Sequence, residues 1–85
     1  MTDNMKALEA VISGVLTLGW QVFEIATDVP AGKEVADGFG YRTAPTGEGC
    51  FDLFQVATSR NTHFCFVWMQ AGKVIWSSRC LSLKW

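Results

Sequence analysis

The segment HFCFVWMQ, residues 63–70, carries six consecutive apolar residues between His63 and Gln70. Its β-branched and aromatic residues favour a β-strand. A strand with one face in water alternates apolar and polar side chains, whereas a strand that is covered on both faces does not. The segment therefore raises the question of what covers its second face.

The neighbouring segments extend this strand into a meander. Residues 50–58, 62–70 and 73–83 are each rich in strand-forming residues. The linkers SRN and AG between them are short enough only for antiparallel hairpins. We therefore expect three consecutive antiparallel strands after residue 49.

The first half of the chain predicts a helix, a strand and a long loop. Residues 4–18 place apolar side chains at three- and four-residue spacing, which is typical of an amphipathic helix. Asp3 or Asn4 can cap its first turn. Residues 20–27 predict a strand, and five glycines with two prolines make residues 28–49 mainly loop. The only strand expected within this loop is a short edge strand in GFGYRT.

Together these elements predict a single α+β domain over residues 1–85. In it, one N-terminal helix packs on a four-stranded, mostly antiparallel sheet. The order of a helix followed by antiparallel strands resembles cystatin-like and other small helix-on-sheet folds. This resemblance concerns architecture alone and implies no function.

Both faces of the predicted sheet are apolar. With two-residue turns at Arg60–Asn61 and Ala71–Gly72, Val67 lies between Phe54 and Trp76. A 15-residue helix is ~22 Å long and ~10 Å wide, and four strands span roughly 19 Å. One helix therefore covers about half of one face. The opposite, aromatic face is the predicted interaction surface, and its residues are Phe51, Leu53, Phe64, Phe66, Trp68, Ile75 and Arg79.

Two explanations of this aromatic face stay open. In one, residues 28–49, which include Phe39 and Tyr41, fold over it as a lid. In the other, which the size of the patch favours, another molecule covers it. We then expect a protein-binding module that forms a homodimer. It can also bind a larger protein target, as small inhibitors of the phage or mobile-element type do.

Other function classes find less support. Phe64, Phe66 and Trp68 resemble a stacking platform for single-stranded nucleic acid, but the basic residues are sparse and the pI is about 5.6. A small-molecule carrier with a pocket between helix, loop and sheet is a third class. His63 is expected opposite Cys80 without a residue to orient it, so we predict no enzyme, no cofactor and no metal site.

Composition sets the cellular context that we expect. The formal net charge is −1, with −5 over residues 1–52 and +4 over residues 53–85. The three cysteines, Cys50, Cys65 and Cys80, are an odd number, which favours reduced thiols in the cytoplasm. No apolar run is long enough to span a bilayer, so no membrane association is expected.

Overall fold

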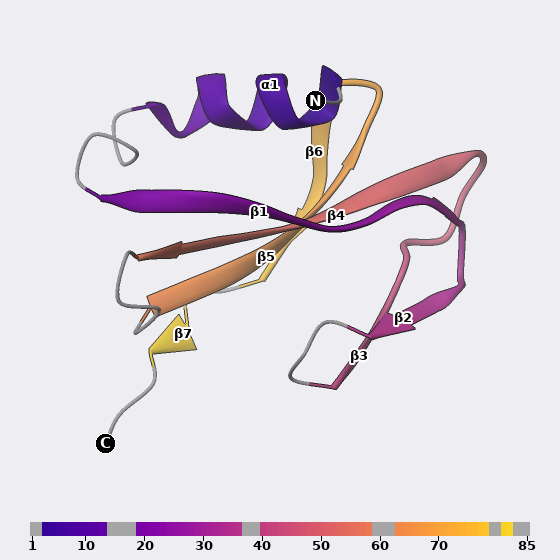
Figure 1. The fold of residues 1–85 in the computed structure, drawn as a ribbon. Coiled ribbons are helices and arrows are strands. Elements are labelled where there is room, and N and C mark those ends of the chain that lie inside the picture. Colours follow the sequence, from indigo (N-terminus) through magenta and orange to yellow (C-terminus); the bar gives the residue numbers. More distant parts are fainter. Residues whose placement is uncertain (1–2, 14–18, 37–39, 59–62, 79–80, 83–85) are drawn as a thin grey trace.

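The computed structural model describes residues 3–13, 19–36, 40–58, 63–78 and 81–82. Figure 1 shows these elements in chain order. They are α1 (Asp3–Val11), β1 (Trp20–Pro30), β2 (Glu34–Ala36), β3 (Tyr41–Thr43), β4 (Cys50–Thr58), β5 (His63–Gln70), β6 (Lys73–Ser77) and β7 (Leu81–Ser82). The main sheet has the antiparallel order β1-β4-β5-β6, and β7 also pairs with β5. Strands β2 and β3 form a separate antiparallel pair.

The predicted α+β class, with an N-terminal helix and a four-stranded antiparallel sheet, is confirmed. The boundaries differ in three places. Strand β1 continues to Pro30, and the strand expected at 73–83 is divided into β6 and β7. The expected loop at 28–49 contains the β2–β3 hairpin. Residues 14–18 of the expected helix lie outside the described residues.

The β4–β5 register is the one expected from a short hairpin, with Phe54 opposite Val67. Side chains of these strands that point toward α1 form one core cluster, and we call this side the helix face. Its buried members are Leu8, Phe54, Val56, Val67 and Met69, all at most 5% exposed. This cluster joins the single apolar stripe of α1 to the middle of the sheet, as helix-on-sheet packing requires.

The opposite side of the sheet is covered by the chain segment between β1 and β4. We call the described residues of 31–49, which include the β2–β3 hairpin, the lid, and the side of the sheet beneath it the lid face. Figure 1 shows α1 and the hairpin on opposite sides of the main sheet. The buried residues of this second cluster are Val29, Ala44, Phe51, Leu53, Ala57, Phe64, Phe66 and Trp68.

Backbone hydrogen bonds and one ring contact fix the lid. The Gly32 N–H donates to the carbonyl oxygens of Ala44 and Pro45, each at 3.2 Å, and the Ala44 N–H donates to Lys33 at 2.8 Å. The guanidinium carbon of Arg42 lies 3.8 Å from the centroid of the Phe66 ring, a cation–π arrangement. The lid is thus tied both to itself and to the centre of the sheet.

Strand β6 begins in the expected register and then departs from it. Ala71 and Gly72 have φ values of 51° and 76°, as a two-residue hairpin turn of the primed type requires. The pairs Gln70–Lys73 and Met69–Val74 follow, but Trp68 pairs with Trp76, so Ile75 is an extra residue. This bulge moves Trp76 from the predicted helix face to the lid face, because one inserted residue reverses the alternation.

Candidate interaction surface

Five of the seven residues of the predicted interaction face are buried. Phe51, Leu53, Phe64, Phe66 and Trp68 are each at most 3% exposed in the single chain. Edge-on ring contacts link Phe51 with Trp68 and Phe64 with Phe66, at centroid distances of 6.5 and 5.6 Å. The expectation that these five side chains await a partner is therefore wrong for this structure, since they form a core cluster of the chain itself.

The physical reason is the lid. One helix is too small to cover both faces of the sheet, so the aromatic face depends on the long segment 28–49 for its cover. That segment packs Ala44, at 3% exposure, and the half-buried Ala31 and Val35 on the lid face. The lid explanation, which the sequence left open, accounts for this face. The expected contribution of Phe39 lies outside the described residues.

The burial of these aromatic rings also argues against the nucleic-acid stacking platform that the sequence suggested. A stacking platform needs rings whose faces are open to bases. Phe64, Phe66 and Trp68 are 3%, 0% and 2% exposed, so none of them offers an open face in this structure.

Two residues of the predicted interaction set remain to be placed. Ile75 is 45% exposed at the bulge of β6. Arg79 lies outside the described residues. Ile75 is therefore the member of the predicted set that the structure leaves open to solvent.

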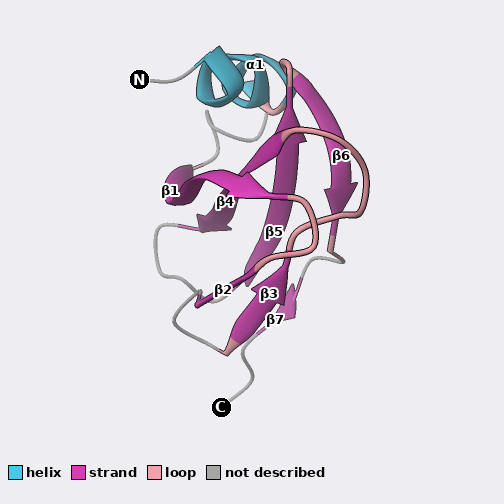
Figure 2. Cartoon of the chain, turned by 90° about the vertical axis from the view of Figure 1, so that its right-hand side faces the viewer, coloured by secondary structure: helices cyan, strands magenta, loops and turns pink. Residues whose placement is uncertain are grey.

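Five of the six large apolar side chains that are exposed among the described residues lie on or near β6, and the sixth, Phe23, lies on β1. Val74, Ile75 and Trp76 follow one another along this strand and are 43%, 45% and 47% exposed. Tyr41 on the lid is 73% exposed and Val11 on α1 is 71% exposed. We call these five residues the β6 band. Figure 2 shows β6 along one margin of the sheet.

Hollows on both sides of β6 connect the members of the band. On the lid side, Tyr41, Arg42, Thr43, Pro45 and Trp68 line a hollow of about 340 Å³ together with Trp76. The second is a groove of about 480 Å³ on the helix side. Its lining residues are Leu8, Val11, Ile12, Trp20, Val56, Cys65, Val67, Val74 and Ser77. The band is therefore one continuous surface that runs from the lid across β6 to the helix.

Strand β6 exposes its side chains and also one edge of its backbone. All five of its residues are exposed, and its only partner among the described strands is β5. An edge strand of this kind presents unpaired N–H and C=O groups, and so is a template for pairing with another chain. Lys73 is its one charged residue. The surface combines apolar side chains with main-chain groups that another strand can pair with.

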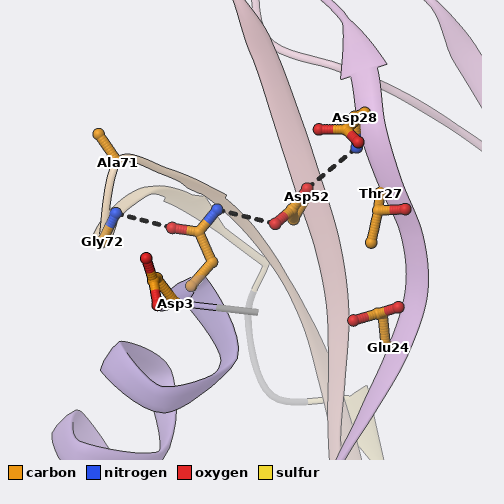
Figure 3. A pocket seen from close by; sticks show the side chains of 8 residues that line it. Asp3, Glu24, Thr27, Asp28, Asp52, Ala71 and Gly72 are labelled. Carbon is orange, nitrogen blue, oxygen red and sulfur yellow. Dashed lines mark hydrogen bonds between the residues drawn. The ribbon is translucent and has the colours of Figure 1, made fainter. Parts of the chain in front are cut away.

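A third hollow, of different chemistry, lies near the start of α1 (Figure 3). It has a volume of about 670 Å³, and its lining includes the acidic residues Asp3, Glu24, Asp28 and Asp52. Asp52 is 7% exposed and accepts hydrogen bonds from the Asn4 amide at 2.8 Å and from the Asp28 N–H at 3.0 Å. The buried carboxylate is therefore already satisfied by groups of the chain.

Asn4 has a different role from the helix cap that the sequence suggested. Its side-chain amide donates to Asp52, and its side-chain oxygen accepts from the Gly72 N–H at 2.7 Å. Asn4 thus joins the first turn of α1 to β4 and to the β5–β6 turn. The contact spans 68 residues from Asn4 to Gly72, and no local pattern indicates it.

In the described part of the chain, no three His, Cys, Asp or Glu side chains are grouped closely enough to hold a metal ion. His63 pairs with Ser82 rather than with Cys80, so the expected register there is wrong. Cys80 itself lies outside the described residues. Cys50 and Cys65 form no disulfide.

Sequence reasoning missed Trp76 and Tyr41 as surface residues. Trp76 was assigned to the helix face because the bulge at Ile75 has no sequence signature. Tyr41 belongs to the lid in one of the two explanations that the sequence leaves open, and its side chain is 73% exposed. A usable signal was present in VIW, residues 74–76, where three large apolar residues occupy consecutive positions of the last long strand. In an edge strand, such a run cannot be buried on both faces.

Comparisons with protein-family models, with curated proteins and with solved structures find no match. In the described residues, no helix is long and apolar enough to cross a membrane.

Proposed function

We propose that this protein is a non-enzymatic protein-binding module that uses the β6 band as its contact surface. The observation that carries the proposal is the coincidence of an open edge strand with the exposed apolar residues Val74, Ile75 and Trp76. Apolar patches of about 300–600 Å² are the largest that monomers usually expose and are often functional. Five side chains at 43–73% exposure are enough to form such a patch.

The mode of binding that fits this surface is strand addition. An extended segment that pairs with an open strand gains main-chain hydrogen bonds, and flanking pockets receive its alternate side chains. Strand β6 has a hollow on each side, one beside Trp76 and one beside Val74. The alternate side chains of an added strand would therefore have a hollow to occupy on each face of the sheet.

The surface also supports the earlier expectation of a larger protein target. Inhibition of a molecular machine is one form that such binding takes, and it requires no catalytic group on this chain. We retain a cytoplasmic location as part of the proposal. The chain has three cysteines, and an odd number favours reduced thiols, which are usual in the cytoplasm. The carrier alternative has a counterpart in the groove beside α1, but that groove shares Val11 and Val74 with the band.

Affinity capture with three matched baits tests the proposal. The baits are the natural chain, Trp76→Glu and Phe23→Glu. Phe23 is the appropriate control because it lies on β1, the other edge of the sheet, and is 44% exposed against 47% for Trp76. A protein that the natural chain and Phe23→Glu retain, and that Trp76→Glu loses, supports the proposal. Equal capture by all three baits contradicts it.

A further inference from the structure

We infer that the partner which fits the β6 band is a second copy of this chain, with the two β6 strands running antiparallel about a twofold axis near Ile75. This inference rests on the proposed function and adds the identity and geometry of the partner. In such an arrangement the same surface serves both copies, and each copy offers and receives the same groups.

The composition of the band suits a second copy. A stable dimer contact buries about 800 Å² on each partner, with an apolar centre and a polar rim. The five apolar side chains of the band supply the centre, and Lys73, Ser77 and Thr43 are exposed beside it and supply the rim. Trp76 is central in this surface, and tryptophan is among the residues that most often dominate binding energy.

Charge favours the antiparallel direction. In a parallel pair the two Lys73 ammonium groups lie side by side, which is unfavourable. In an antiparallel pair centred on Ile75 they lie at opposite ends, about four residues or ~13 Å apart. At physiological ionic strength that separation exceeds the screening length of ~8 Å. The net charge of −1 adds little repulsion between whole copies.

Chain length gives a further reason for association. A domain of 85 residues buries only about 60–65% of the surface of its unfolded chain, and small folds often gain stability from a second copy. The lid and α1 already use their buried side chains on the two faces of the sheet. Among the described residues, most of the apolar surface that a second copy can still bury therefore lies along the band.

Sedimentation equilibrium tests the identity of the partner. The natural chain is expected to sediment with twice its 9.4 kDa mass at micromolar concentration. Trp76→Glu is expected to raise the dissociation constant at least about 30-fold, the size of a hot-spot loss. Phe23→Glu, at almost equal exposure, is expected to change it less than about twofold. A natural chain that stays at 9.4 kDa up to high micromolar concentration overturns the inference.

Cysteine cross-linking tests the geometry independently of any loss of folding. In a chain with Cys50, Cys65 and Cys80 replaced by serine, Ile75→Cys places a thiol close to its own copy across the axis. Antiparallel partners have Cα atoms about 4.5–5.5 Å apart, which suits a disulfide.

Lys73→Cys, two residues away on the same strand, is the matched control, since its copies lie too far apart to bridge. Oxidation is expected to give a covalent dimer with Ile75→Cys and to leave Lys73→Cys monomeric. Equal cross-linking at both positions overturns the antiparallel geometry.

The two proposals fail in distinguishable ways. If the natural chain is monomeric but captures another protein that Trp76→Glu does not capture, the second copy is excluded and the protein-binding function stands. If the natural chain is monomeric and capture is the same for all baits, both proposals fail.

Discussion

Trp68 and Trp76 are directly opposite each other on neighbouring strands, yet their environments differ completely. Trp68, on β5, is 2% exposed beneath the lid, whereas Trp76, on β6, is 47% exposed. The lid therefore covers the sheet as far as β5 and leaves β6 open. The same residue type on the same face serves the core in one strand and is available for binding in the next.

This difference separates the residues that hold the fold from those that we propose to bind a partner. Substitutions beneath the lid, as on β5, should therefore change folding stability. Substitutions on the open strand β6 should change association.

The largest effect is expected from Trp68→Ala. Removal of a fully buried tryptophan costs about 3–5 kcal/mol of unfolding free energy, which is close to the total stability of many small domains. Trp76→Ala is expected to cost at most about 1 kcal/mol, the size of a cross-strand contact at an exposed site. Urea denaturation followed by circular dichroism measures both, at chain concentrations where the natural protein is monomeric. Similar losses for the two variants would remove the distinction.

An intermediate effect is expected where α1 anchors the start of β6. Asn4→Ala removes hydrogen bonds to Gly72 and to the buried carboxylate of Asp52. We expect a loss of about 1.5–3 kcal/mol in unfolding free energy, because one of these bonds involves a charged group. Lys6→Ala, an exposed position on the same helix, is the control and is expected to change stability by less than about 0.5 kcal/mol. Equal changes would show that Asn4 does not anchor the turn.

A gain in stability is expected on the lid face. Gln55 is 8% exposed, and its side-chain nitrogen has no hydrogen-bond partner. Gln55→Met keeps the shape and removes the cost of burying an unsatisfied amide, so we expect unfolding free energy to rise by about 1 kcal/mol. Gln21→Met, at an exposed position of β1, should be close to neutral. A loss at position 55 would indicate that the amide is satisfied.

The smallest effect is expected in the turn that starts β6. Ala71 has a φ of 51°, a conformation that asparagine tolerates better than alanine. Ala71→Asn creates the Asn-Gly pair that primed turns favour and is expected to add about 0.5 kcal/mol of stability. Ala71→Val should instead lose about 1 kcal/mol or more, because a β-branched residue is strained there. Thermal denaturation of the two variants measures the sign of each change.

The sequence predicted most of the fold because the decisive interactions there are periodic or local. Alternation and a short linker set Phe54 opposite Val67. The AG dipeptide predicted the two-residue turn that leads into β6.

The surface was predicted less well because its determinants are not local. Coverage of Phe66 depends on Arg42, which lies 24 positions earlier in the chain. The face of Trp76 depends on one extra residue, Ile75, in the middle of a strand. A pattern with a period of two carries no information about where such a residue is inserted.

The irregular course of β1 has a consequence for the size of any assembly. Its pairing with β4 shifts register twice, against one shift for β6, and it exposes two charged side chains, Glu24 and Asp28, against the single Lys73 of β6, so β1 is the poorer acceptor for another strand. A chain with two receptive edges would add neighbours without limit and grow into a fibre. Of the two edges of the described main sheet, the proposal uses β6 alone, so growth ends after a single addition and the proposed assembly contains two chains.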